Sequence, residues 1–274
     1  MKRIVQRLFV TLTILALLSC GHMTIITGGP ESPVLDRVKK AGELRVGMTG
    51  NQPPFNMTTQ EGDIIGFEVD LAERIAGAMG VSLKTVTMPF SELLPALENG
   101  RVDMVLSSLT ITPERNLKVA FVGPYFISGK SVLTKIRTLA EADGAAELNS
   151  PDVRLVVLKG STSQAFVDEV LPRTTRLLAN SYDEAINLVL EDKVHAMFAD
   201  YPICLISLLR HPGSGLVSVV MPLTYEPIGI ALPAGDPLLV NWMENFMAAL
   251  DGSGGLDKIE IKWLENGSWI KRLP

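Results

Sequence analysis

The chain has 274 residues, of which 47% are hydrophobic and 20% charged, and its formal net charge is −5. This length and apolar content suffice for one large folded domain or two moderate ones, and they exclude a chain that is disordered over most of its length. Without the first 19 residues, 22 Lys and Arg residues face 30 Asp and Glu residues, which gives −8 (22 − 30). That balance excludes a nucleic-acid-binding protein, because phosphate binding needs clustered basic side chains.

The N-terminal segment is typical of an export signal. Three basic residues flank or precede the apolar run 8–18, which is too short to span a bilayer. The run ends at Ser19-Cys20, which resembles the bacterial lipoprotein signal, in which the chain is cut before the cysteine and the cysteine carries lipid. We therefore expect a signal peptide over residues 1–19, lipid on Cys20 and a tether over residues 20–33. An ordinary secretory signal is the alternative, and either signal exports the protein.

The hydrophobic pattern of the first half predicts alternating strands and helices. Strands are expected at 44–48, 81–88 and 104–106, with helices at 66–79 and 91–97 between them. Both helices are followed by a stop signal, Gly or Asn-Gly. This order predicts a parallel sheet with right-handed crossovers.

The same pattern restarts in the second half. Strands are expected at 153–158, 175–178 and 195–198, with helices at 164–171 and 182–190. The chain therefore contains two α/β units of one kind, each with its own sheet.

Two stretches are candidates for the connections between these units. One is 121–125, and the other is 225–227, each followed by an apolar run. Two crossings mean that one lobe is continuous and the other is built from both ends of the chain. We expect the first lobe to comprise residues 34–127 plus 224–274, and the second lobe to comprise residues 128–223.

The segment after the third strand carries the clearest binding chemistry. Thr112-Pro113 predicts a helix start, with a hydroxyl N-cap and proline at the first helical position. The segment therefore lies at the carboxyl end of a strand, where open α/β sheets bind ligands. Ser108 and Thr110 can offer hydroxyls there, and the guanidinium of Arg115 offers a fork of donors that suits a carboxylate. A solvated role for Arg115 at the helix start is the alternative.

These motifs resemble the bacterial extracellular solute-binding proteins of family 3, the polar amino-acid receptors of ABC importers. The most specific match is the block from Asp103 to Arg115, and the resemblance covers about residues 34–265. The resemblance implies an α/β, two-lobed periplasmic-binding-protein-like fold of type II, with a ligand cleft between lobes joined by two crossing strands. Shorter matching stretches are Pro53-Pro54-Phe55, Ile65 to Leu71, Gly123-Pro124-Tyr125, Gly160-Ser161-Thr162 and Ile259 to Trp263.

The resemblance also implies ligand contacts in the first lobe. In that family the arginine of the block binds the ligand α-carboxylate, which gives Arg115. The threonine and the small residue two positions before it contact the carboxylate and the α-amino group, which gives Thr110 and Ser108. Phe55 and Phe90 would form apolar walls, and a plain core role is the alternative for each phenylalanine.

The second lobe supplies the remaining implied contacts. The turn after its first strand donates main-chain N–H groups, which gives Thr162 with Ser161 nearby. The aspartate after its third strand pairs with the α-amino group, which gives Asp200.

A solute-binding protein of this kind is expected to capture an amino acid, a similar zwitterion or a related carboxylate. It would then deliver that ligand to an ABC transporter permease from the periplasm or another extracytoplasmic position. The resemblance implies a monomer that is held to the membrane through Cys20, has no catalytic residues and needs neither a cofactor nor a metal. The lobes are expected to close on the ligand by hinge motion.

Two other functions stay open. Cyclohexadienyl dehydratases share this fold and also read Val-Gly-x-Thr-Gly, as residues 46–50 do here. They need an acid to protonate a leaving hydroxyl, but the expected glutamate is Ile203 and an expected aspartate is Asn51. A ligand-sensing receptor module is the other possibility. The three histidines lack metal-ligand spacing, and we expect Cys204 to be a small buried hydrophobe and not a nucleophile.

Overall fold

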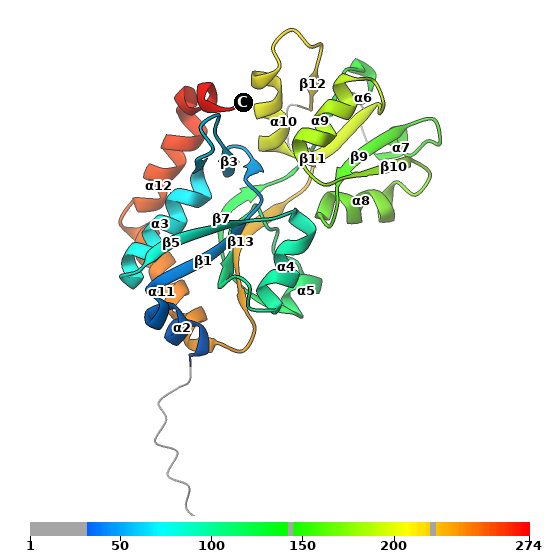
Figure 1. Cartoon of the computed structure of the whole chain (residues 1–274). Helices are drawn as coiled ribbons and strands as arrows, with labels where there is room; N and C mark the ends of the chain where they lie inside the picture. Colours follow the sequence, from blue (N-terminus) through cyan, green and yellow to red (C-terminus); the bar gives the residue numbers. More distant parts are fainter. Residues whose placement is uncertain (1–31, 142–144, 220–222) are drawn as a thin grey trace, which may run out of the picture. The chain divides into compact units, whose positions relative to one another are not determined.

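The structure is a computed structural model that describes residues 32–141, 145–219 and 223–274 (Figure 1). The expected signal peptide, Cys20 and the tether up to residue 31 lie outside the described residues. None of the helices in the described part is long and apolar enough to cross a membrane.

The first part of the chain, joined by β13 from near the C-terminal end, forms a five-stranded sheet in the order β5-β1-β6-β13-β7. It also forms a small three-stranded sheet in the order β2-β3-β4. Strand β1 runs parallel to β5 and β6, as the alternating pattern predicted. Strand β13 is antiparallel to β6 and to β7, so the larger sheet is mixed and not purely parallel. The strands are β1 (Glu43–Met48), β2 (Asn51–Gln52), β3 (Asn56–Thr58), β4 (Ile64–Ile65), β5 (Ser82–Thr87), β6 (Met104–Val105), β7 (Val119–Ser128) and β13 (Glu226–Pro233).

The second five-stranded sheet repeats this arrangement, in the order β10-β9-β11-β8-β12. Strands β10, β9 and β11 are parallel, whereas β8 is antiparallel to both β11 and β12. Its strands are β8 (Lys130–Thr134), β9 (Arg154–Leu158), β10 (Thr175–Ala179), β11 (Ala196–Asp200) and β12 (Val217–Ser218).

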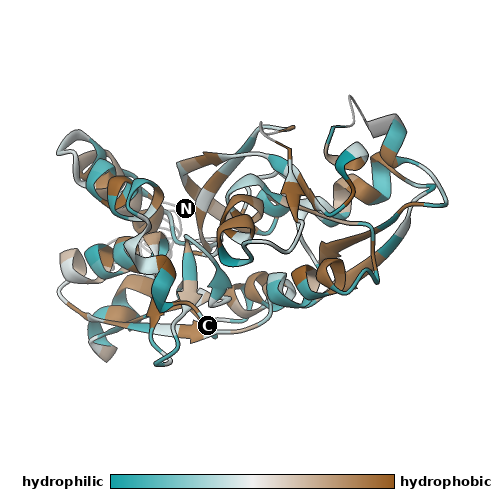
Figure 2. Ribbon diagram, turned by 90° about the horizontal axis from the view of Figure 1, so that it is seen from above, coloured by the Kyte–Doolittle hydropathy of each residue, from teal (hydrophilic) through white to brown (hydrophobic). Residues whose placement is uncertain are grey.

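Helices pack on both sheets, and the longer ones carry apolar residues on one side and polar residues on the other (Figure 2). The helices predicted near 66–79 and at 182–190 are confirmed. Helix α4 begins at Phe90, one residue before the predicted start, and extends to Glu98. With the first sheet lie α2 (Pro33–Ala41), α3 (Phe67–Met79), α4 (Phe90–Glu98), α5 (Pro113–Asn116), α11 (Pro237–Gly252), α12 (Gly255–Glu260) and the π-helical and 3-10 turns Ile261–Glu265 and Gly267–Arg272. With the second sheet lie α6 (Arg137–Ala140), α7 (Ala145–Leu148), α8 (Thr162–Val170), α9 (Tyr182–Leu190) and α10 (Tyr201–Arg210).

The chain passes between the two large sheets twice. Strand β7 ends at Ser128 and β8 begins at Lys130, so the outgoing crossing follows the predicted stretch 121–125, which lies inside β7. The chain returns between β12 and β13, whose first residue, Glu226, pairs with Ser128. We call the elements around the first sheet the first lobe and those around the second sheet the second lobe. The two crossings thus lie side by side.

Apolar packing is continuous from one lobe to the other. One core cluster lies in the first lobe around Phe55 and its neighbours, with contributions from the C-terminal helices. A second cluster joins Leu93 and Val105 of the first lobe to Val156 and Met197 of the second. The lobes of the described structure are therefore in contact, and polar groups at their junction are held close to one another.

Candidate functional site

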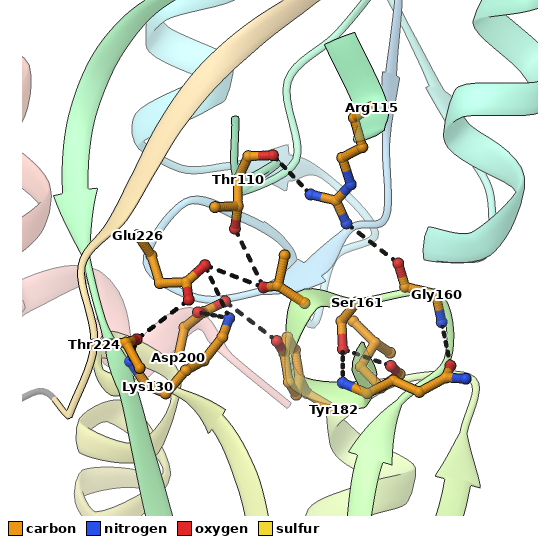
Figure 3. A network of polar contacts seen from close by, with 12 residues as sticks. Thr110, Arg115, Lys130, Gly160, Ser161, Tyr182, Asp200, Thr224 and Glu226 are labelled. Atoms are coloured by element: carbon orange, nitrogen blue, oxygen red, sulfur yellow. Dashed lines mark hydrogen bonds and ion pairs between the residues drawn. The ribbon is translucent and has the colours of Figure 1, made fainter. Parts of the chain in front are cut away.

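The helix predicted at Thr112-Pro113 is present and places Arg115 at the lobe junction. The Thr112 hydroxyl accepts a hydrogen bond from the main-chain N–H of Arg115 (3.3 Å), and proline occupies the first helical position of α5. This N-cap satisfies one of the free N–H groups at the helix start. Helix α5 has only four residues, so it serves mainly to direct the side chain of Arg115 toward the second lobe (Figure 3).

The guanidinium of Arg115 bridges the two lobes through uncharged acceptors. It donates to the carbonyl oxygen of Thr110 in its own lobe (2.8 Å) and to that of Gly160 in the second lobe (3.2 Å). The ring of Phe90 lies under it, with 5.8 Å between the guanidinium carbon and the ring centroid. Burial lowers the pKa of Arg115, while the carboxylates of Asp200 and Glu226 oppose that shift. Arginine stays cationic under such conditions, so this charge has no direct carboxylate partner among the described residues.

A cluster of three ionisable side chains lies across the junction from Arg115 (Figure 3). The ammonium of Lys130 donates to the carboxylate of Asp200 (2.6 Å) and lies 3.5 Å from the carboxylate of Glu226. The Lys130 side chain is only 1% exposed. The hydroxyl of Tyr182 donates to the second oxygen of Asp200 at 3.4 Å. Two carboxylates thus share a single buried ammonium.

The formal charges at this junction are separated in space. Lys130, Asp200 and Glu226 together carry −1, from one cation and two anions. Arg115 carries +1 and is bound only to carbonyl oxygens. The junction can therefore accept an anionic group on one side and a cationic group on the other.

Two threonines connect Arg115 with the acidic cluster. The hydroxyl of Thr162, the first residue of α8, donates to the carboxylate of Glu226 (3.1 Å) and lies 3.4 Å from the hydroxyl of Thr110. The carboxylate of Glu226 also accepts from the hydroxyl of Thr224 (3.2 Å). A chain of polar contacts thus runs from Arg115 through both threonines to Glu226.

The structure therefore brings together four of the eight residues expected to contact the ligand: Thr110, Arg115, Thr162 and Asp200. Phe90 is buried beside the guanidinium, as described above. The hydroxyl of Ser161 is used within its own turn, where it donates to the carbonyl of Leu158 (2.6 Å) and caps α8 by accepting from the N–H of Gln164 (3.2 Å).

Ser108 and Phe55 make none of these contacts at the junction. Ser108 has a positive φ of 48°, and its buried hydroxyl has no hydrogen-bond partner among the described residues. Phe55 is 1% exposed and packs edge-on against Phe67 and Phe126, inside the apolar core. The positive φ is a conformation that glycine adopts more readily than serine.

Lys130 and Glu226 were missed by the sequence analysis. Lys130 is the one charged residue in an apolar crossing segment, and Glu226 directly precedes a proline in the other predicted crossing. A charge in a segment expected to be buried is a usable signal for a paired group. The sequence did not show which partner each charge would find.

Behind the loop that carries Ser108 lies a buried polar network centred on Glu68 of α3, which is fully buried. Its carboxyl accepts from the main-chain N–H of Ser108 (2.5 Å), from the amide of Asn56 (2.5 Å) and from the hydroxyl of Tyr125. Burial raises the pKa of Glu68 to about 7, although all three hydrogen bonds act to lower it. The network ties the loop before Thr110 to strand β7, which leads to the second lobe.

The remaining chemistry of the described residues is sparse. They contain no group of three or more His, Cys, Asp or Glu residues that could hold a metal ion. Cys204 is fully buried, as expected, and burial raises the pKa of its thiol to about 12, so it is not a thiolate nucleophile at neutral pH.

Known proteins with similar sequences identify the family. The profile of the bacterial extracellular solute-binding proteins, family 3, matches residues 44–266. Cyclohexadienyl dehydratase from Pseudomonas aeruginosa is 27% identical over 231 residues, which cover 84% of this chain and 86% of that protein. ABC transporter arginine-binding protein 1 from Escherichia coli is 26% identical over 229 residues, covering 81% and 91%.

A solved structure agrees with these matches. The ancestral amino acid-binding protein AncCDT-1, described as a precursor of cyclohexadienyl dehydratase, superposes with a TM-score of 0.76 and 34% identity, covering 84% of this chain and 98% of that chain. The fold is that of a two-lobed binding protein of the periplasmic type. This chain belongs to the bacterial extracellular solute-binding proteins of family 3, as its motifs predicted.

The raised pKa of Glu68 predicts that the unfolding free energy depends on pH. The pKa is about 7 in the folded protein and 4.5 for an ordinary glutamate, so folding favours the protonated form. The stability from this group is fully present below pH 4.5 and is lost as the pH rises through about 7. Relative to Glu68→Gln, which does not titrate, the wild type should lose about 3 kcal/mol of unfolding free energy between pH 4.5 and 8.

Denaturant unfolding of both proteins across this pH range measures the difference. The matched control is Glu73→Gln, which removes a carboxyl group from the exposed face of the same helix. A constant difference between the wild type and Glu68→Gln would contradict the proposed titration.

Proposed function

We propose that this protein binds an amino acid or a similar small zwitterion outside the cytoplasm and delivers it to the permease of an ABC transporter. The observation that carries the proposal is the separation of charge at the lobe junction. Arg115 offers a cation without a direct carboxylate partner, and the Lys130, Asp200 and Glu226 cluster offers a net negative charge. An α-amino acid carries the two complementary charges on neighbouring atoms, so it can satisfy both.

In this proposal the guanidinium of Arg115 binds the ligand carboxylate as a fork of donors. Thr110 and the N-terminus of α8, at Thr162 with Ser161 as its cap, provide further hydrogen bonds to that carboxylate. The buried hydroxyl of Ser108 is a further donor or acceptor for the ligand. Phe90 supports the guanidinium from behind, whereas the packing of Phe55 favours its core role.

Closure of the two lobes would complete the site. We propose the lobe boundaries expected from the sequence, with 34–127 plus 224–274 against 128–223. The contact of Arg115 with Gly160 and the contact between the two threonines cross this boundary. Groups of the two lobes would separate when the hinge opens and meet around the ligand when it closes.

Relatives support a transport role. The Escherichia coli relative is named as an arginine-binding protein of an ABC transporter, and AncCDT-1 is described as an amino acid-binding protein. We propose that the protein is an extracytoplasmic monomer that passes its amino acid to a membrane permease. We propose that Cys20 carries the lipid that keeps it at the membrane.

A dehydratase is the second candidate, because cyclohexadienyl dehydratase is among the relatives. Such an enzyme needs a side chain that gives a proton to the leaving hydroxyl. Ile203, at the position where that acid was expected, is an apolar side chain that is 1% exposed. Ile203 therefore cannot give that proton, and turnover of prephenate or arogenate distinguishes binding from the dehydratase reaction.

A thermal-shift screen of the twenty amino acids, prephenate and arogenate tests the proposed function. At 100 times its dissociation constant a ligand adds about 2.7 kcal/mol to the unfolding free energy. We expect at least one α-amino acid to give such a shift, and no turnover of prephenate or arogenate. In Arg115→Gln the affinity should fall by roughly 30-fold or more, since about 2 kcal/mol or more is lost when a buried charge loses its partner.

The matched control is Arg137→Gln, an exposed arginine on α6, which should bind like the wild type. Wild-type affinity in Arg115→Gln would refute the assigned carboxylate contact. A shift with prephenate or arogenate together with turnover, and none with any amino acid, would favour the dehydratase.

Lipid attachment is tested separately by metabolic labelling with a palmitate analogue. Because the signal resembles that of lipoproteins, the wild type should be labelled and recovered with membranes, whereas Cys20→Ser should be unlabelled. Equal release of both proteins in soluble form would instead show an ordinary secretory signal.

A further inference from the structure

We propose that Glu226, and not Asp200, is the residue that receives the ligand's ammonium group. This inference rests on the proposed function, because it names the acceptor within the same site. The family resemblance assigned that role to Asp200. The contacts of the buried Lys130 indicate different roles for Asp200 and Glu226.

Asp200 is already neutralised by a charge of the protein itself. Its carboxylate accepts a hydrogen bond of 2.6 Å from the ammonium of Lys130, and the two side chains are 7% and 1% exposed. A buried pair of this kind is stable only while both partners are kept, because removal of either leaves an uncompensated charge. A ligand ammonium that bound Asp200 would have to share it with Lys130 at very short range.

Glu226 has neutral hydrogen-bond partners and lies further from the ammonium of Lys130 than Asp200 does. Its two oxygens accept from the hydroxyls of Thr162 (3.1 Å) and Thr224 (3.2 Å), and the Lys130 ammonium is 3.5 Å away without a hydrogen bond. Hydroxyl donors orient a carboxylate without cancelling its charge. The uncompensated negative charge of the cluster therefore lies mainly on Glu226.

Glu226 is also connected to the carboxylate side of the site. The ammonium and the carboxylate of an α-amino acid are attached to the same carbon, so their binding groups must be close together. Arg115 binds the carbonyl of Thr110, whose hydroxyl lies 3.4 Å from that of Thr162, and Thr162 donates to Glu226. Asp200 is joined instead to Tyr182 and Lys130.

The position of Glu226 in the fold links this contact to closure. It is the first residue of β13 and pairs with Ser128 at the end of β7, so it lies where the two crossing strands run side by side. Its partner Thr162 belongs to the second lobe. A ligand ammonium at Glu226 would therefore bind at the connection between the lobes.

Calorimetric titration of two variants distinguishes the role of Glu226 from that of Asp200. The probes are the proteinogenic amino acid with the largest thermal shift in the screen above and the carboxylic acid that lacks its α-amino group. Glu226→Gln removes the proposed acceptor and keeps the Lys130–Asp200 pair. The double variant Lys130→Met with Asp200→Asn removes that pair as a unit and keeps the cluster's formal charge of −1 on Glu226.

The measured quantity is the preference for the amino acid over its deaminated acid. We expect Glu226→Gln to reduce this preference by about ten-fold or more. The double variant should weaken both probes by a similar factor, so that its preference stays within about three-fold of the wild type. Circular dichroism first establishes that each variant is folded.

Two results would overturn the proposal. One is that Glu226→Gln keeps the wild-type preference for the amino acid over its deaminated acid. The other is that only the double variant loses this preference. If the double variant does not fold, Glu226→Gln still decides, because a kept preference excludes Glu226 as the acceptor. If the wild type binds no amino acid in the screen, the proposed function fails and this inference fails with it. If the wild type binds an amino acid but the variants give either of the two results above, only the role of Glu226 is refuted.

Discussion

The site depends on opposite charges that are kept apart at the junction of the two lobes. Arg115 is bound to carbonyl oxygens, whereas Lys130 is shared between Asp200 and Glu226. Removing charges from water costs several kcal/mol per ion unless partners replace the lost hydration. In the proposed function, a zwitterion between the lobes would supply a partner to each side at once, so that binding and closure would favour the same state.

The first lobe contains a second buried network that supports this junction. Glu68 binds the main chain of Ser108 and, through Tyr125, the strand that leads to the second lobe. A loop with a positive φ at a serine needs such support, because the conformation is unfavourable without it. Glu68 and Tyr125 thereby help to fix the position of the segment that carries Thr110.

Local signals were enough to predict much of the fold and part of the site. The N-cap at Thr112 and the strand that ends at Asp200 follow from patterns a few residues long, and the family block indicated Arg115. The charged partners could not be predicted in this way. Lys130 and Asp200 are 70 residues apart in sequence, and Glu226 meets Thr162 across 64 residues. Such pairs are set by how the two crossing segments meet, which no local pattern encodes.

The most direct measurement is a crystal structure of the protein with the amino acid that gives the largest thermal shift. We expect the ligand carboxylate to lie within hydrogen-bond distance of the Arg115 guanidinium, about 2.7–3.2 Å between heavy atoms. The ligand ammonium should lie at a similar distance from the acidic cluster that contains Glu226. A ligand that touches neither Arg115 nor this cluster, or one bound with its ammonium toward Arg115, would contradict the charge separation as the basis of binding.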